Sequence, residues 1–234
     1  MDNNTICHLL ELQRDQVFEK LKSKPISVLY KEMYKDIKAG RMFVFDNKER
    51  KVLQALKKLG NNPSFDISLA KKLNEYVNLD NDQLITYFQT EFGKILNQMT
   101  ESGKIDEMQA LFIEYDYYYH FTSCVTCYGL QEYPFIVEPR YITNEYDYNK
   151  EVWFLQNGIN FQPAWKDCEE FEGVTYLNIN YEIESLFKLH SRVLLHKALV
   201  KLGENKKLDV FRNRPFSFYI NEHDNEVMIL YRVS

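Results

Sequence analysis

The stretch Ala110–Phe121, "ALFIEYDYYYHF", decides the fold class because its side chains alternate in character with a period of two. The odd-numbered positions from Leu111 onward are all apolar or tyrosine. The even-numbered positions from 114 onward are polar or ionisable: Glu114, Asp116, Tyr118 and His120. Because successive side chains of a β-strand point to opposite faces, the stretch predicts a strand with an aromatic core face and a polar outer face.

Upstream of this strand the sequence shows helical periodicity, with apolar residues recurring three and four positions apart. Pro25 separates the first two helices, and Asp46 with Glu49 forms a capping box at the start of the third. The predicted helices are Thr5–Leu21, Ile26–Lys38, a segment from the Asp46 cap to Gly60, Asp66–Val77 and Asp80–Thr100, with Arg41–Asp46 as a short strand.

Downstream of residue 104 β-branched and aromatic runs dominate, and only one long helical pattern, Glu182–Leu202, interrupts them. The other predicted strands are Ser123–Tyr128, Val152–Leu155, Val174–Tyr181, and a hairpin of Phe216–Ile220 with Val227–Val233. Helices followed by strands predict an α+β fold. We expect a single domain over residues 1–234, in which a helical subregion (1–104) packs on a mostly antiparallel, sheet-rich subregion (105–234).

The polar side of the 110–121 strand has two interpretations. As a solvated surface it needs no function. As the floor of a cleft, its carboxylates and its histidine would be suited to acid–base catalysis or metal binding. The sequence alone leaves both interpretations open.

His120, Cys124 and Cys127 have the spacing H-x3-C-x2-C, which is typical of zinc ligands. In an unbroken strand, however, residues 120 and 124 would lie about 13 Å apart, at roughly 3.3 Å per residue. Cys124 and Cys127 would also point to opposite faces. We therefore expect the four cysteines to be structural thiols, with no metal, no disulfide and no cofactor.

Two further groups of histidines and acids have structural explanations. His190 and His196 are six residues apart in the long helix, so they lie on different sides of it. His190 shares an arc with Leu186 and Val193, which predicts a core position. Residues 222–224 (Glu-His-Asp) fall between the two strands of the hairpin and predict a solvated turn.

Composition restricts the functional classes. The chain lacks G-x-S-x-G, Walker A, G-x-G-x-x-G and H-E-x-x-H motifs. Its formal charge of −5 disfavours nucleic-acid binding, because proteins of that class usually present a basic surface. No apolar run is long enough to span a membrane, and no secretory signal is visible, so we expect a cytoplasmic protein.

Tyrosine and acidic residues alternate twice, as EYDY at 114–117 and again at 145–148. Tyrosine is common in protein interfaces, and adjacent acids favour a basic partner. We therefore expect a non-enzymatic protein that neutralises a basic protein, as a bacterial immunity protein does, and the sequence leaves its oligomeric state open. The expected contacts are Glu145, Tyr146, Asp147 and Tyr148, extended by Glu114, Asp116, Tyr118 and His120. The alternative is a metal-dependent or acid–base hydrolase that uses Glu114, Asp116 and His120.

Overall fold

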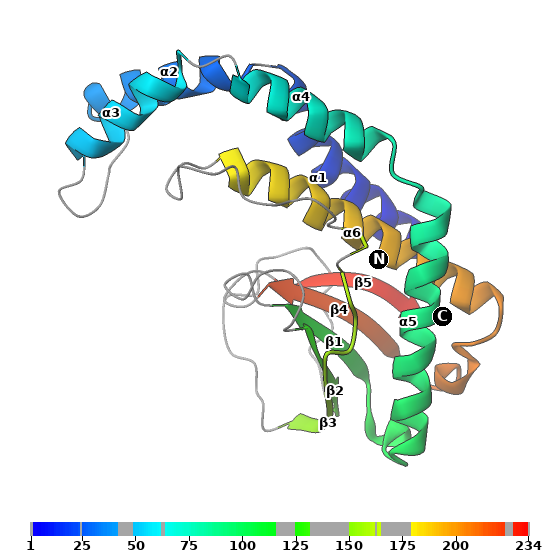
Figure 1. Cartoon of the computed structure of the whole chain (residues 1–234). Coiled ribbons are helices and arrows are strands. Elements are labelled where there is room, and N and C mark those ends of the chain that lie inside the picture. Colours follow the sequence, from blue (N-terminus) through cyan, green and yellow to red (C-terminus); the bar gives the residue numbers. More distant parts are fainter. Residues whose placement is uncertain are drawn as a thin grey trace. The chain divides into compact units, whose positions relative to one another are not determined.

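A computed structural model describes residues 2–23, 25–41, 49–61, 64–115, 125–131, 150–161, 163–164, 179–222 and 227–233 (Figure 1). The helices in these ranges are α1 (Asn3–Ser23), α2 (Ile26–Lys38), α3 (Glu49–Leu59), α4 (Ser64–Val77), α5 (Asn81–Glu101) and α6 (Ile179–Glu204), with short 3₁₀ turns η1 (Ile105–Glu107) and η3 (Asp209–Phe211). The strands are β1 (Ala110–Tyr115), β2 (Val125–Leu130), β3 (Glu151–Gln156), β4 (Phe216–Glu222) and β5 (Met228–Val233). This order confirms the predicted α+β class.

The predicted helices are confirmed where residues that favour helix ends, such as N-caps, lie at the predicted positions. Asp80 accepts a hydrogen bond from the Gln83 backbone N–H at 3.0 Å and so caps α5, as its position in the sequence predicted. Helix α3 begins at Glu49, the second residue of the predicted capping box. The cap itself, Asp46, lies outside the described residues, as does all of the predicted Arg41–Asp46 strand except its first residue.

The predicted strand Val174–Tyr181 is wrong over its last three residues. Residues 179–181 form the start of α6, and residues 174–178 lie outside the described ranges. A short run of apolar and β-branched residues is ambiguous between strand and helix. Here the helical pattern that follows residue 181 extends back over the end of the run.

The chain folds as two compact units. Unit 1 comprises Met1–Gln13, Asp80–Asp167 and Lys188–Ser234, and unit 2 comprises Arg14–Leu79 and Cys168–Phe187. The division falls inside α1 and inside α6. The expectation of one domain over residues 1–234 concerns both units together and stays a prediction.

Unit 1 contains a five-stranded sheet with the order β3-β2-β1-β4-β5. The central pair, β1 and β4, is parallel, whereas the other three pairs are antiparallel. The sheet is therefore mostly antiparallel, as predicted, and the β4–β5 pair forms the predicted hairpin. Strands β4 and β1 lie far apart in the sequence, and the connection from β3 to β4 contains α6.

One face of this sheet carries the odd-numbered residues of β1 and packs against helices of the same unit. Phe218, which shares this face, lies 5.9 Å from the Phe92 ring of α5, measured between ring centroids. Tyr115 accepts a hydrogen bond at 2.7 Å from Arg192 of α6. The prediction that the odd-numbered face of β1 is a core face is confirmed for Leu111, Ile113 and Tyr115.

The other face of β1 is also buried, which corrects the expectation of a solvated surface at Glu114. Phe112 is fully buried, and only 8% of the Glu114 surface is exposed. Because β1 is the central strand, Glu114 is flanked on this face by Thr126 of β2 and Asn221 of β4. The polar character of Glu114 therefore does not mark an outer face.

Unit 2 is held by a helix cap and an aromatic cluster. Asp66, in the first turn of α4, accepts hydrogen bonds from the backbone N–H and the hydroxyl of Ser27 at 3.0 and 2.8 Å, and so caps the N-terminus of α2. Tyr76 lies between Phe18 and Phe187, with ring centroids 5.1 and 5.7 Å away. Burial raises the pKa of Tyr76 to about 12.

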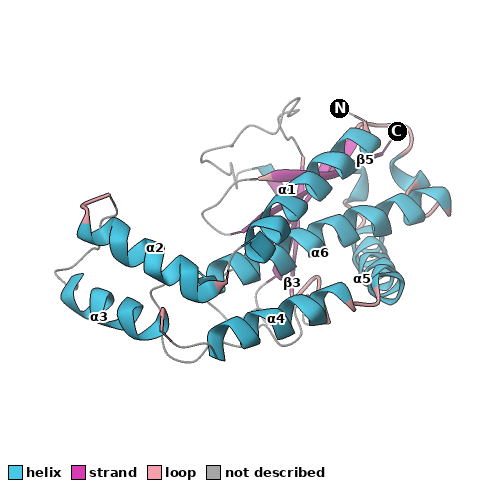
Figure 2. Ribbon diagram, turned by 90° about the horizontal axis from the view of Figure 1, so that it is seen from above, coloured by secondary structure: helices cyan, strands magenta, loops and turns pink. Residues whose placement is uncertain are grey.

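Helix α1 begins in unit 1, and its first turns lie beside the C-terminal half of α6 (Figure 2). An ion pair of 2.8 Å between Glu11 and Lys197 joins them. No helix within the described ranges is both long enough and apolar enough to cross a membrane.

Candidate functional site

Of the eight residues predicted to form a site, the structure places only Glu114. The others lie outside the described residues: Asp116, Tyr118, His120, Glu145, Tyr146, Asp147 and Tyr148. Cys124, Cys168 and the hairpin turn at 223–226 lie outside them as well. The candidate site therefore comprises the surroundings of Glu114 and the edges of the sheet that contains it.

Glu114 lies in a row of polar side chains that crosses three strands. Thr126 of β2 is its antiparallel partner, and Asn221 of β4 is its parallel partner. Partners in adjacent strands point to the same face, so a hydroxyl, a carboxylate and an amide lie side by side. The next row on that face is aromatic, with Phe154, Tyr128, Phe112 and Tyr219 on four successive strands.

Asn221 carries an unsatisfied polar atom in this row. Its side chain is 5% exposed, and no described donor reaches its buried Oδ1. An amide oxygen beside a carboxylate is an acceptor set, suited to an ammonium, a guanidinium or a water molecule. The sequence did not indicate Asn221 because the predicted strand ends at Ile220, whereas β4 continues to Glu222.

The described residues offer little to a metal ion. No three His, Cys, Asp or Glu side chains within the described ranges lie close enough to hold one. The zinc hypothesis involves His120 and Cys124 and so stays outside what the structure describes. Its third member, Cys127, is fully enclosed, and burial raises the pKa of its thiol to about 12, which keeps the sulfur protonated.

His196 has a structural role at a β-bulge. Strand β5 contains one extra residue, Leu230, opposite the step from Phe218 to Tyr219. The Leu230 carbonyl is 2.6 Å from His196 Nδ1, and a carbonyl can only accept, so Nδ1 donates. Burial lowers the pKa of His196, which favours the neutral ring with its proton on Nδ1.

The neutral state of His196 predicts a pH dependence of stability. Because its folded pKa is below the unfolded value of 6.5, stability is fully present above that pH and is lost as the pH falls through the folded pKa. His196→Asn keeps a donor near the Nδ1 position and removes the titration. Urea unfolding at pH 7.5 and 5.5 should show a smaller loss in this variant than in the parent. His8→Asn, at an exposed position, is the control, and equal losses in His196→Asn and the parent would contradict the assignment.

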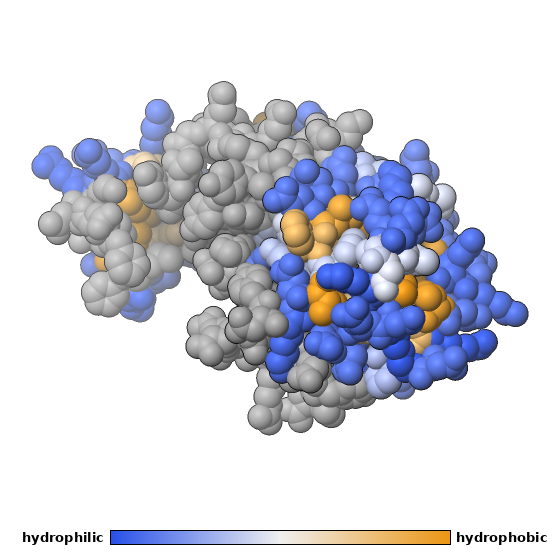
Figure 3. All heavy atoms as spheres, turned by 90° about the horizontal axis from the view of Figure 1, so that it is seen from below, coloured by the Kyte–Doolittle hydropathy of each residue, from blue (hydrophilic) through white to orange (hydrophobic). Residues whose placement is uncertain are grey.

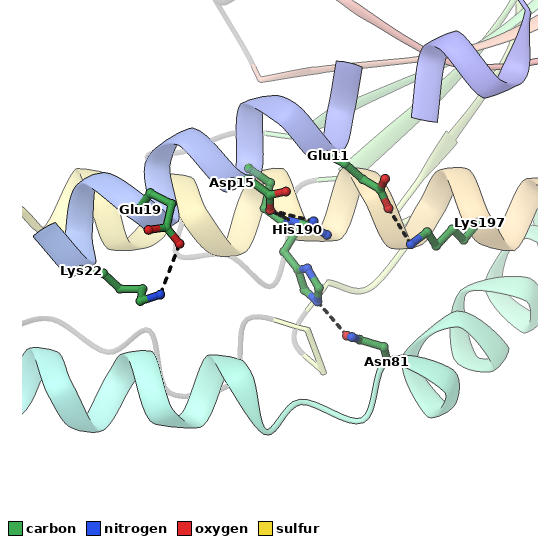
Figure 4. A network of polar contacts seen from close by, with 8 residues as sticks. Glu11, Asp15, Glu19, Lys22, Asn81, His190 and Lys197 are labelled. Carbon is green, nitrogen blue, oxygen red and sulfur yellow. Dashed lines mark hydrogen bonds and ion pairs between the residues drawn. The ribbon is translucent and has the colours of Figure 1, made fainter. Parts of the chain in front are cut away.

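His190 is buried, as predicted from the arc it shares with Leu186 and Val193. Its Nε2 lies 2.8 Å from Oδ1 of Asn81, the first residue of α5 (Figure 4). The contact joins α6 to the start of α5 within unit 1. Like His196, this histidine is held by packing and by a hydrogen bond between elements, and both belong to the scaffold.

A cationic pair on α6 lies over Tyr115. The Lys188 ammonium and the Arg192 guanidinium are 5.9 and 6.0 Å from the centre of the Tyr115 ring. Arg192 also donates to the Tyr115 hydroxyl and to the Met228 sulfur, both at 2.7 Å. Cations over an aromatic face are attracted by its quadrupole, so the pair fixes the end of β1 against α6.

The two edges of the sheet differ. At the β5 edge the Asn3 amide donates to the Arg232 carbonyl and accepts from the Arg232 N–H, both at 2.9 Å. These are the backbone groups that an added strand would use, so Asn3 closes this edge at Arg232. At the other end of the sheet, β3 is bonded to β2 alone among the described strands (Figure 1).

Strand β3 presents an exposed aromatic residue at this edge. Phe154 is 58% exposed, the highest value among the large hydrophobic residues described in unit 1. In the right-hand part of Figure 3, hydrophobic residues seen from below form small patches between hydrophilic ones. The sequence run Val152–Leu155 predicted the strand, but not that it lies at an edge.

The backbone of Phe154 points away from β2. Hydrogen bonds from Gln131 to Lys150 and from Gly158 to Val125 show that odd-numbered residues of β2 bond to β3. Their partners Trp153 and Leu155 therefore use their backbone groups toward β2, and Phe154 directs its N–H and C=O to the open side. The carbonyl of Val152, the extra residue of a second bulge, is bonded by the Lys104 ammonium at 3.0 Å.

Comparison of this chain with protein-family models, with curated proteins and with solved structures found no match in any of the three.

Proposed function

We propose that this chain is a non-enzymatic, cytoplasmic protein that binds and neutralises a basic protein. The observation that carries the proposal is the exposed Phe154 at an open sheet edge of a chain with a formal charge of −5. An exposed aromatic residue on a regular element is a typical interface anchor. The net negative charge attracts a basic partner and speeds its encounter.

The acidic–aromatic segment at residues 145–148 is proposed as a second contact. It lies six residues before Phe154 in the sequence at its nearer end. Acids in such a segment act chiefly on the association rate, because charge steers the encounter. Tyrosines act chiefly on the dissociation rate, because their burial holds the complex together.

The test is a low-salt capture experiment with the full chain, followed by kinetics with the captured protein. We expect a basic protein that is retained by this chain and not by an unrelated acidic protein of equal charge. Raising the salt concentration should slow its association, since the screening length is already about 8 Å at physiological ionic strength. Charge reversal at Glu145 and Asp147 should have the same effect, and Tyr146→Ala should hasten release. Equal capture by the acidic control would refute the proposal.

The second candidate function is a hydrolase that uses Glu114, Asp116 and His120. The burial of Glu114 beside Asn221 favours it, because a carboxylate in a sheltered polar row resembles a catalytic acid or base. Glu114→Gln separates the two functions. A hydrolase would lose turnover on its substrate with its fold intact, whereas a binding protein would keep its affinity for the basic partner.

A further inference from the structure

The open edge of β3 can accept one more strand. Phe154 offers a backbone donor and a backbone acceptor on the side away from β2, and no described residue bonds to either. Gln156, two residues further, has the same orientation by alternation. The first half of β3 is less suitable, because Val152 forms a bulge and the Lys104 ammonium occupies its carbonyl.

We infer that Phe154–Gln156 binds an extended segment of the basic partner as a sixth strand of the sheet. The inference rests on the proposed function and specifies how that function is carried out. Backbone hydrogen bonds to an edge strand supply affinity, and side chains that alternate between the faces supply selectivity. The opposite edge cannot take this role at Arg232, where the Asn3 side chain already bonds both backbone groups.

Charge near the edge favours a basic segment. Glu151 belongs to β3 itself, and Asp106 and Glu107 belong to η1, which follows directly on Lys104. Among the described residues, the Lys104 ammonium is engaged with the Val152 carbonyl, and Asp106 is paired with Arg214 at 3.8 Å. Glu151 and Glu107 are therefore the acids of these two segments that attract a basic segment. A second copy of the chain would bring another charge of −5 to the same edge, which disfavours self-association.

The side chains around Phe154 indicate the pattern of the segment. Phe154 and Tyr128 are partners across β3 and β2, so their rings share one face. A lysine or arginine beside them would pack its stem on the rings and gain a cation–π attraction. The next residue of the segment would point to the other face. The geometry thus selects a strand in which basic residues alternate with β-branched ones.

The probe is the blocked octapeptide (Lys-Val)4, titrated into the ¹⁵N-labelled full chain. We expect the amide resonances of Phe154 and Gln156 to shift. An analogue with alternate amides N-methylated has the same charge but lacks donors along one edge. It should bind about tenfold more weakly, because each lost hydrogen bond changes affinity by a factor of roughly two to twelve.

Two variants distinguish the contribution of the Phe154 backbone N–H to peptide binding from that of its side chain. Phe154→Pro removes the donor at a position where an edge strand tolerates proline, and should weaken binding about tenfold. Phe154→Ala keeps the backbone N–H and should weaken it less. Thermal melts establish that both variants fold.

Three outcomes would overturn the inference. The first is peptide binding that neither N-methylation nor Phe154→Pro weakens. The proposed function would then remain, with binding through the acidic surface instead of the strand edge. The second is no binding of the peptide at all, in which case the capture experiment decides the proposed function separately. The third is a dimer in sedimentation that Phe154→Pro dissociates, which would assign the edge to a second copy.

Discussion

Phe218→Ala should lower the free energy of unfolding by about 3–5 kcal/mol, the usual cost of removing a fully buried phenylalanine. Phe218 is completely enclosed and lies where α5, η3 and two aromatic strand residues meet. Its ring centroid is 5.2–6.2 Å from those of its neighbours: Phe92, Phe211, Phe216 and Tyr231. The alanine variant would lose these contacts and leave a cavity that a close-packed centre cannot fill.

Phe154→Ala is the matched control for Phe218→Ala, because the same atoms are removed from the same sheet. Phe154 is largely exposed, so its loss should change stability by less than about 0.5 kcal/mol. Urea unfolding of the two variants and the parent gives both values. Similar costs at the two positions would show that the faces and edges of the sheet are assigned wrongly.

Gly158→Ala should destabilise unit 1 by about 1–3 kcal/mol through overpacking. A Cβ at Gly158 would overlap the Sγ of Cys127 and lie 3.3 Å from its Cβ. The thiol is buried in β2, and the Gly158 backbone is tied to the same strand by its hydrogen bond to Val125, so neither can easily move aside.

Cys127→Ala offers a specific rescue of Gly158→Ala, since it removes the sulfur that the new methyl group would meet. The loss in free energy of unfolding of the double variant should be smaller than the sum of the losses of the two single variants, because the new methyl group occupies the space that the sulfur leaves. Additive free energies of unfolding, measured in urea, would contradict the close packing of Gly158 on Cys127.

Much of the fold follows from local patterns in the sequence. The period-2 run at Ala110–Phe121 and the helical runs before it predict an α+β chain, and the predicted bounds of Ile26–Lys38 are those of α2. Such patterns work because a face of a helix or strand must be apolar where it meets a core. They fail at residues 179–181, where a short β-branched run continues into a stronger helical pattern.

Burial of the polar face of β1 could not be predicted in this way. On that face β1 is flanked by its parallel partner β4, which follows more than a hundred residues later. Glu114 therefore has the sequence pattern of an outer residue and the environment of an inner one. Asn221 could not be predicted as a site residue for the same reason, because it matters only through its position beside Glu114 in the folded sheet.

The difference between the two sheet edges is equally non-local. Asn3 and Arg232 are 229 residues apart in the sequence, and only their contact shows that the β5 edge is closed. In the sequence, Phe154 has the pattern of an ordinary strand residue. Only the strand order, which places β3 at the end of the sheet, shows that it lies at an edge. Edges are properties of the assembled sheet, so the site proposed here required the structure.

Amide hydrogen exchange at Phe154 shows whether the sheet has one edge closed at Arg232 and one open edge at β3. The Leu155 N–H points toward β2, and the Arg232 N–H is bonded to Asn3, so both should exchange slowly in the free protein. The Phe154 N–H has no described partner and should exchange far faster than either. Exchange at Phe154 as slow as at Leu155 would show that the β3 edge is already closed and would rule out strand addition there.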